Sequence, residues 1–115
     1  MKETVINWMG LRVRQKGVLA VTAVFSDRSL FNHSFSTAYP QGALEVLGHA
    51  LQDLAQLMGK QRVAASRIKW LFENAQVLTT MRHDGVILAL VCLRNSASLD
   101  VAAIERLLAE FEELS

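Results

Sequence analysis

The stretch "VILALVCL", residues 86–93, decides how this chain folds. It is almost wholly apolar and rich in residues that favour β structure, which predicts a strand covered on both faces. A second run of the same kind, "VLAVTAVF" at 18–25, lies far from it in the chain. Two such strands belong in the middle of a sheet, where helices can cover both sides.

A hairpin is expected directly before residues 86–93. Asp84-Gly85 is a strong hairpin signal, because both central residues of a type I′ turn need positive φ. The run "AQVLTTMR" predicts the paired strand, at 76–82. His83 and Asp84 could also be an acid/base pair, but adjacent residues in a strand point to opposite faces, so their side chains are badly placed to hydrogen-bond. The segment therefore predicts a bend and not a catalytic loop.

Two further strands are expected beside these. "LFNHSFST" alternates apolar and polar residues, which predicts a strand at 30–37 that is covered on one face. "IKWLF" predicts a strand at 67–72, with Trp70 and Phe72 on the same face. Placing the two most apolar strands in the centre gives a five-stranded antiparallel sheet. Its order is 2-1-5-4-3, with the strands numbered along the chain.

Three helices complete the prediction. The clearest covers 40–58, because Pro40 suits the first turn of a helix. A short helix is expected at 3–14, and a last one begins after Ser98, which can cap it with Asp100 in its first turn. The expected buried stripe of that last helix is Val101, Ile104, Leu108 and Phe111. The chain thus predicts an α+β fold in a single domain, 1–115, with helices on both faces of the sheet.

The helix at 40–58 carries two apolar stripes, although a surface helix of a monomer usually needs one. The first stripe is Leu44, Leu47, Leu51, Leu54 and Met58. The second is Ala43, Val46, Ala50 and Leu57. One can pack on the sheet and the other against a second helix, with Gly48 nearby to allow close approach. The pattern does not decide which stripe faces the sheet.

Composition narrows the class of protein. The formal net charge is +1 over 115 residues, which gives no overall attraction to nucleic acid or to a membrane surface. No stretch approaches the roughly 20 apolar residues that cross a bilayer. Cys92 is the only cysteine, so an internal disulfide is impossible and a reducing compartment is indicated. We expect a cytoplasmic protein that binds neither nucleic acid nor membrane.

No group of residues indicates an active site. Cys92 lies in an apolar strand without a basic or histidine neighbour, which is typical of a buried, inert thiol. His33, His49 and His83 are widely separated, and none has the spacing of a metal site. A glycine-rich phosphate loop is also missing from the sequence. We expect no catalytic residue, no metal, no cofactor and no enzymatic activity.

The segment "GKQRVAASRIKW", residues 59–70, is basic and contains no acidic residue. One interpretation is a solvated loop that leads into an edge strand, with Lys69 discouraging unwanted edge pairing. The other is a docking patch for a protein with an acidic surface, formed by Lys60, Arg62 and Arg67.

The element order, together with "GVLAVTAVFSDRSLFNHSF", "RIKWLFENAQVLTTMRHDGVILALVCL" and "SLDVAAIERLLAEFEEL", resembles the roadblock/dynein light chain family, a profilin-like α/β sandwich. The resemblance covers residues 17–115. Asp27-Arg28-Ser29 stands where the family usually has Asp-Gly in its first hairpin. The resemblance implies a homodimer that joins its long central helices and third strands. It also implies a scaffold or regulatory role, since many such proteins bind or regulate small Ras-like GTPases.

These observations predict a non-catalytic homodimeric scaffold or regulatory module, with a small GTPase or another acidic protein as its candidate partner. The alternative is a small ligand-sensing domain, since helix-flanked antiparallel sheets also form pockets, or another protein-interaction domain of profilin-like fold. The expected dimer interface consists of Ala43, Val46, Leu47, Ala50, Leu54, Leu57, Lys69, Trp70 and Phe72.

Overall fold

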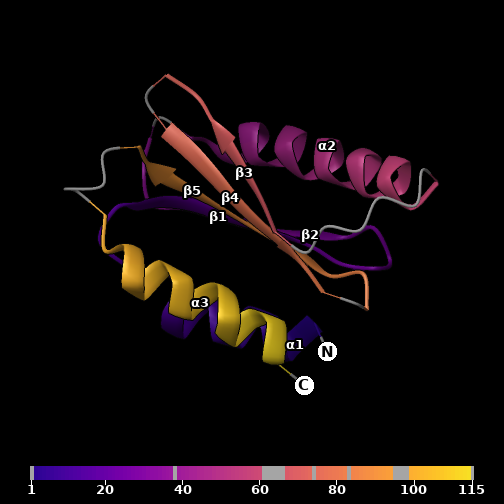
Figure 1. Cartoon of the computed structure of the whole chain (residues 1–115), viewed down its shortest axis with the longest axis horizontal. Helices are drawn as coiled ribbons and strands as arrows, with labels where there is room; N and C mark the ends of the chain where they lie inside the picture. Colours follow the sequence, from indigo (N-terminus) through magenta and orange to yellow (C-terminus); the bar gives the residue numbers. More distant parts are fainter. Residues whose placement is uncertain are drawn as a thin grey trace.

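The computed structural model describes residues 2–37, 39–60, 67–73, 75–82, 84–94 and 99–114. This part of the chain forms a sheet with α2 on one face and α1 and α3 on the other (Figure 1). The elements are α1 Lys2–Arg12, β1 Val18–Val24, β2 Leu30–Ser34, α2 Gln41–Lys60, β3 Arg67–Leu71, β4 Ala75–Met81, β5 Ile87–Leu93 and α3 Val101–Glu113. No helix in these ranges is long and apolar enough to cross a membrane.

The predicted α+β fold and strand order are confirmed. The sheet runs β2-β1-β5-β4-β3, and every neighbouring pair is antiparallel. β1 and β5 pair in the centre, with Val24 opposite Ile87 and Ala20 opposite Val91. Both strands are buried almost throughout, as their continuous apolar sequences predict.

The central strands separate two apolar cores. On the α1 and α3 side, Leu88 and Leu90 pack with residues such as Trp8 and Phe111. On the α2 side, Val91 is among the strand residues that pack with Leu44 and Leu51. The central pair therefore contributes apolar side chains to both cores, and burying them is the main favourable term in folding.

The structure decides the orientation of α2. Leu44 and Leu51 are buried on the sheet, so the first stripe faces inward. The second stripe faces outward, and all its members are exposed: Ala43, Val46, Ala50 and Leu57. Gly48 lies on the inner face, where an added Cβ would come within 2.9 Å of Leu30 Cδ2. The expectation that Gly48 helps a second helix approach was wrong, because it lets α2 approach β2.

α3 begins later than expected. Asp100 is its N-cap and accepts a hydrogen bond from the Ala103 amide at 3.0 Å, whereas Ser98 lies outside the described residues. The buried stripe is Ile104, Leu107, Leu108 and Phe111. The prediction that Val101 is buried was wrong, because it starts the first turn and leaves about half of its side chain exposed.

The β4–β5 and β1–β2 hairpins close with the same pattern of backbone hydrogen bonds. Before β5, the Arg82 amide donates to Val86 O at 2.9 Å and the Gly85 amide donates to Arg82 O at 3.1 Å, with Gly85 at φ 92°. This arrangement is a turn closed by a positive-φ bulge residue, so the predicted two-residue type I′ turn was wrong. Asp84 accepts from the Val86 amide and pairs with Arg82, and His83 lies outside the described residues.

The β1–β2 hairpin repeats this loop without glycine. The Phe25 amide donates to Ser29 O and the Arg28 amide to Phe25 O, both at 2.9 Å. Arg28 has φ 74° and takes the place that Gly85 holds in the other hairpin. Asp27 accepts from the Ser29 amide, as Asp84 does from Val86. Asp27-Arg28 thus takes the backbone shape that Asp84-Gly85 takes in the other hairpin.

Two arginines tie α3 to the sheet. Arg67 on β3 donates two hydrogen bonds of 2.9 Å to Glu112 and one of 2.7 Å to Glu105. These hydrogen bonds from Arg67 are the main reason that the pKa of Glu112 lies below its usual range. Arg82 is buried and donates to the carbonyls of Phe111 and Leu114, so it caps the C-terminal end of α3.

The two matched hairpins give the first prediction. Arg28→Gly should raise the free energy of unfolding by about 0.5–1 kcal/mol, because it removes left-handed strain but adds freedom to the unfolded chain. Gly85→Ala should lower it by about 1 kcal/mol or more. An added Cβ at 85 would lie 3.7 Å from Ser26 Cβ, which is an ordinary contact. The loss of stability in Gly85→Ala would therefore come from backbone strain and not from a steric clash. Urea unfolding measures both values, and a shift of both variants in the same direction would contradict the shared loop.

A second prediction concerns Arg67 and Glu112. A carboxylate whose pKa is lowered by folding stabilises the protein above its unfolded pKa of about 4.3, and this stabilisation is lost as the pH falls through the folded value. Arg67→Gln should therefore lower the free energy of unfolding by about 0.5–1 kcal/mol at pH 7, given the partial exposure of the pair. The difference from the wild type should become progressively smaller below about pH 4. Urea unfolding across pH tests this. Glu113→Gln, at a neighbouring exposed carboxylate, is the control. If Arg67→Gln lowered the free energy of unfolding equally at pH 7 and at low pH, the link between the Glu112 pKa and stability would be refuted.

Candidate interaction surface

The helices cover the centre of the sheet better than its β3 end. α2 packs mainly on β1 and β2, at the opposite side of the sheet from β3. β3 is an edge strand, and among the described strands it pairs with β4 alone. Among the described residues, no strand pairs with the outer edge of β3, and α2 lies away from this end of the sheet.

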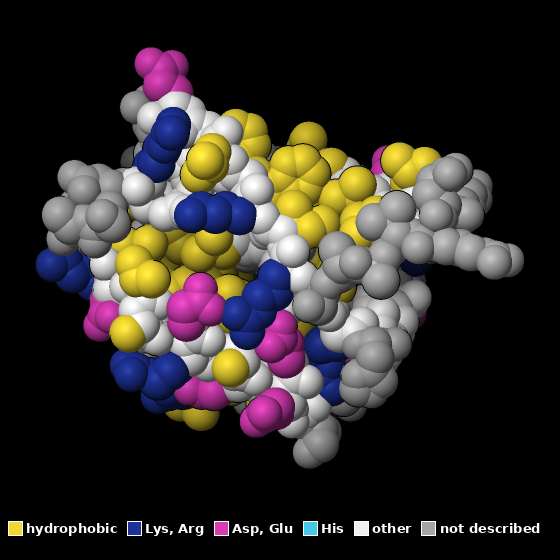
Figure 2. All heavy atoms as spheres, in the orientation of Figure 1, with side chains coloured by type: hydrophobic (Ala, Val, Ile, Leu, Met, Phe, Trp, Pro, Cys, Tyr) yellow, Lys and Arg dark blue, Asp and Glu magenta, His cyan; other side chains and the backbone are white. Residues whose placement is uncertain are grey.

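Several exposed apolar side chains gather over this part of the molecule. Val46 and Leu57 on α2 are 71% and 55% exposed, and Phe72 directly after β3 is 54% exposed. Figure 2 shows yellow apolar side chains gathered in the region where Figure 1 places α2. We call this the α2/β3 surface and define it by Ala43, Val46, Ala50, Leu57, Trp70 and Phe72. Contiguous exposed apolar side chains of this kind mark interaction sites more often than single ones do.

An apolar cavity of about 430 Å³ opens within the α2/β3 surface. Ala43 and Leu47 on α2 form one side, and Phe72 and Val77 on the strands form the other. The cavity exists because α2 lies toward β1 and β2 and leaves β4 partly uncovered. A side chain from a second molecule could fill it.

Trp70 adds an unusual polar group to this surface. Its ring packs with the α2-side core, but its buried Nε1 has no hydrogen-bond partner among the described residues. Thr79 Oγ1 is also buried without a hydrogen-bond partner among the described residues. Thr79 lies on the same face of the sheet as Trp70, because Trp70 is opposite Val77 and Thr79 is two residues after Val77 on β4. An unsatisfied buried polar group costs about 1–3 kcal/mol.

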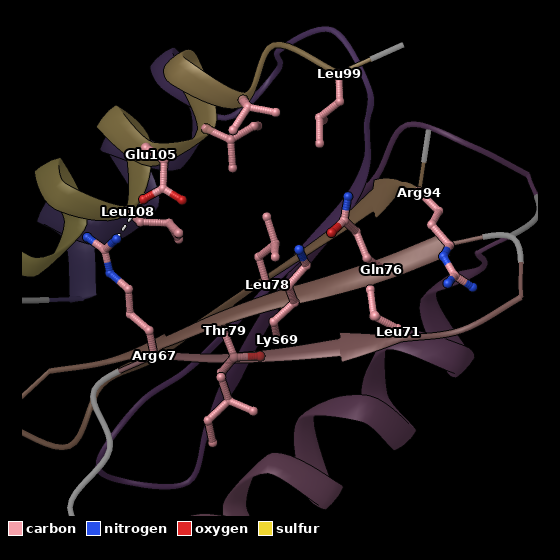
Figure 3. Close-up of a pocket in the computed structure, with 13 residues that line it drawn as sticks. Arg67, Lys69, Leu71, Gln76, Leu78, Thr79, Arg94, Leu99, Glu105 and Leu108 are labelled. Carbon is pink, nitrogen blue, oxygen red and sulfur yellow. Dashed lines mark hydrogen bonds and ion pairs between the residues drawn. The ribbon is translucent and has the colours of Figure 1, made fainter. Parts of the chain in front are cut away.

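The structure divides the expected interface residues into three sets. The outward stripe of α2 lies together with Trp70 and Phe72 on the α2/β3 surface. Leu47 and Leu54 are half-buried on the inner side of α2. Lys69 projects from the other face of β3, toward α3 (Figure 3). Strand alternation separates Lys69 from Trp70, so Lys69 does not lie on the α2/β3 surface.

The three basic residues proposed for docking have different outcomes. Arg62 and the side chain of Lys60 lie outside the described part of the structure. Arg67 is held by Glu105 and Glu112 of its own chain. Those two carboxylates are far from Arg67 in sequence, so no local pattern could have revealed the pairing. Arg67 is therefore not a free positive charge for an acidic partner.

Cys92 has no sign of reactivity. Its side chain is fully buried in β5, and burial raises the pKa of the thiol to about 12. A thiol in this environment stays protonated near neutral pH and is a poor nucleophile. Within the described ranges, no group of three His, Cys, Asp or Glu residues is placed to hold a metal ion.

Sequence comparison finds no matching family model and no matching curated protein. Solved structures do match. MglB from Myxococcus xanthus has a TM-score of 0.60 at 12% identity, over 84% of this chain and 81% of that one. A roadblock/LC7 domain from Streptomyces avermitilis gives 0.56 at 14% identity, over 88% of both chains. The gliding protein MglB from Thermus thermophilus gives 0.58 at 12%, over 96% of this chain and 87% of that one. The chain therefore has the roadblock fold, as its sequence resemblance implied.

Proposed function

We propose that this chain is a non-catalytic interaction module that works as a homodimer and serves as a scaffold or regulator of another protein. The observation that carries the proposal is the outward apolar stripe of α2, where Val46 and Leu57 are mostly exposed. A single domain in water has no structural use for this stripe, because the inner stripe already anchors α2 to the sheet.

The geometry of the α2/β3 surface suits a second copy of the same chain. Ala43 and Ala50 are small, so the α2 helices of two copies can approach closely. The free edge of β3 can pair with its symmetry mate and extend the sheet. Such a contact is isologous, which is the commonest form of oligomer, and a stable interface should bury about 1,200 Å² or more in total.

Two features of the surface support a partner there. The cavity beside Phe72 is apolar and lies between α2 and the strands, so an apolar side chain of the second copy can enter it. The buried Nε1 of Trp70 lacks an acceptor among the described residues, and the approach of another chain to β3 can supply one. Both features are at the place where the resemblance to roadblock proteins implies dimer contacts.

A small Ras-like GTPase is the candidate partner of the dimer. This part of the proposal rests on the resemblance to the roadblock family and on the shared fold of the chain and the MglB proteins. The basic segment at 59–70 offers a docking patch for an acidic protein surface. Its candidate contacts are Lys60 and Arg62, because Arg67 is already paired with Glu105 and Glu112.

A ligand-sensing domain is the second candidate function, and the cavity beside Phe72 favours it. A volume of about 430 Å³ lies within the usual range for small-molecule pockets. A ligand in this cavity would compete with the second copy for the α2/β3 surface. The two candidates therefore differ in the oligomeric state that they require.

The dimer gives the third prediction. Light scattering on the wild type at tens of micromolar should give twice the chain mass of 12.8 kDa. The double variant Val46→Glu, Ala50→Glu should dissociate at least about a hundredfold more readily, because unpaired buried charges cost several kcal/mol. Leu11→Glu is the matched control, since Leu11 is 84% exposed but lies on α1, and it should remain dimeric.

The outcomes separate the alternatives. A wild type that is monomeric at this concentration contradicts the dimer and leaves ligand sensing as the better candidate. If the double variant and the Leu11→Glu control are both dimeric, the interface lies elsewhere than the α2/β3 surface.

The partner gives the fourth prediction. A pull-down from the native cell should recover a small GTPase with the wild-type chain. Recovery should fall with Arg62→Glu at low salt, since reversing a docking charge mainly slows salt-sensitive association. Lys16→Glu reverses an exposed charge on the loop before β1 and should leave recovery unchanged. Recovery of other proteins without any GTPase would count against this partner, and equal recovery with Arg62→Glu would remove the basic segment from the contact.

A further inference from the structure

A second cavity lies on the opposite face of β3. It measures about 420 Å³ and is enclosed by β3, β4 and α3 (Figure 3). Its apolar wall includes Leu78 on β4 and Ile104 and Leu108 on α3. In Figure 2, yellow side chains form the floor of a hollow that has dark blue basic side chains at its margin. The volume and the apolar wall are those of a small-molecule pocket with a few polar groups.

Two cations line this cavity without an acidic partner. Lys69 points from β3 toward α3, and Arg94 extends from the end of β5 (Figure 3). Neither side chain has an ion pair among the described residues, and the remaining positions of the chain contain no Asp or Glu. Arg94 donates from Nη1 to Phe72 O at 2.9 Å, which orients the guanidinium and leaves further N–H donors.

Other charges at the cavity are already balanced. Arg67 and Glu105 lie at one end, joined by an ion pair of 2.7 Å. Among the described residues that line the cavity, Glu105 is the only acidic one, so no lining carboxylate is left there for Lys69 or Arg94. The cavity therefore combines an apolar wall with an excess of positive charge.

The strand register places the unpaired cations at different points along the cavity, with Lys69 opposite Leu78 on β4 and Arg94 beyond the end of β5. Lys69 and Leu71 alternate onto the α3 side of β3, where Leu71 lies opposite Gln76. Gln76 is buried and donates to Leu93 O, one residue before Arg94. A ligand that lies along this face, from Lys69 toward Arg94, would thus contact both apolar and cationic side chains.

We propose that this cavity binds a small amphipathic carboxylate. Its apolar body lies against Leu78, Ile104 and Leu108, its carboxylate accepts a hydrogen bond from Lys69, and Arg94 adds positive charge at the end of the cavity beside β5. Charge-assisted hydrogen bonds of this type are about twice as strong as neutral ones. A neutral apolar ligand would fill the same wall but leave the two cations unpaired.

This site is independent of the proposed dimer. The α2/β3 surface uses the face of β3 that carries Trp70, whereas Lys69 and Leu71 point to the other face. Carboxylate binding should therefore persist in the Val46→Glu, Ala50→Glu variant. A failure of one proposal leaves the other to be tested on its own.

Calorimetric titration with decanoate is the direct test. We expect saturable binding at one site per chain with a Kd below about 1 mM, a modest affinity for a ligand of this size. Lys69→Gln should weaken binding about tenfold, as the loss of one charged hydrogen bond would, and Arg94→Gln, which removes the second positive charge, should weaken it by a smaller factor. Lys16→Gln is the matched control and should leave the Kd unchanged. Decanol, which has the same chain without the charge, should bind the wild type at least about tenfold more weakly than decanoate.

Methyl NMR locates the bound ligand. Decanoate should shift the methyl signals of Leu78, Ile104 and Leu108, and leave those of Leu44 and Leu47 beside the other cavity unchanged. The spectrum also shows that each variant is folded. Absence of saturable binding below about 1 mM, equal affinity for decanol, or shifts confined to Leu44 and Leu47 would each overturn the proposal.

Discussion

The pairing of β1 with β5 is the constraint on which the rest of the structure depends. Both strands are apolar on both faces, so the fold must cover the sheet on both sides. α2 supplies one cover, and α1 and α3 supply the other (Figure 1). Short loops then place β2 beside β1 and β4 beside β5, and β3 is left at the edge. The position of β3 is therefore a consequence of which strands must be central.

The edge position gives β3 two different surfaces. Its side chains alternate, so Trp70 points toward the α2 side while Lys69 and Leu71 point toward the α3 side. Because no described helix lies fully over either face at this end, a cavity of about 430 Å³ opens on one side and one of about 420 Å³ on the other. The first is apolar and suits a protein surface, whereas the second carries unpaired cations and suits an anion.

The sequence predicted the sheet well because its signals are local. The unbroken apolar runs identified β1 and β5, and their central pairing determined the strand order. It failed where a feature depends on contacts between distant residues. Nothing near Gly48 reveals that Leu30 lies against it, and the ion pairs of Arg67 join residues 38 and 45 positions apart. The first hairpin was hidden for another reason, since Arg28 adopts a positive φ that sequence patterns assign to glycine.

The basic residues around α3 differ in whether they are paired within the chain, and this difference relates the fold to the candidate ligand site. Arg82 is buried and caps the end of α3, and Arg67 binds two carboxylates along the same helix. Both guanidinium groups have partners within the chain, and both fix α3 against the sheet. Lys69 and Arg94 take no part in that attachment, although they line the space between α3 and the strands. The paired arginines therefore hold the apolar wall in place while the unpaired cations remain available, and a wall held in advance lowers the ordering cost of binding.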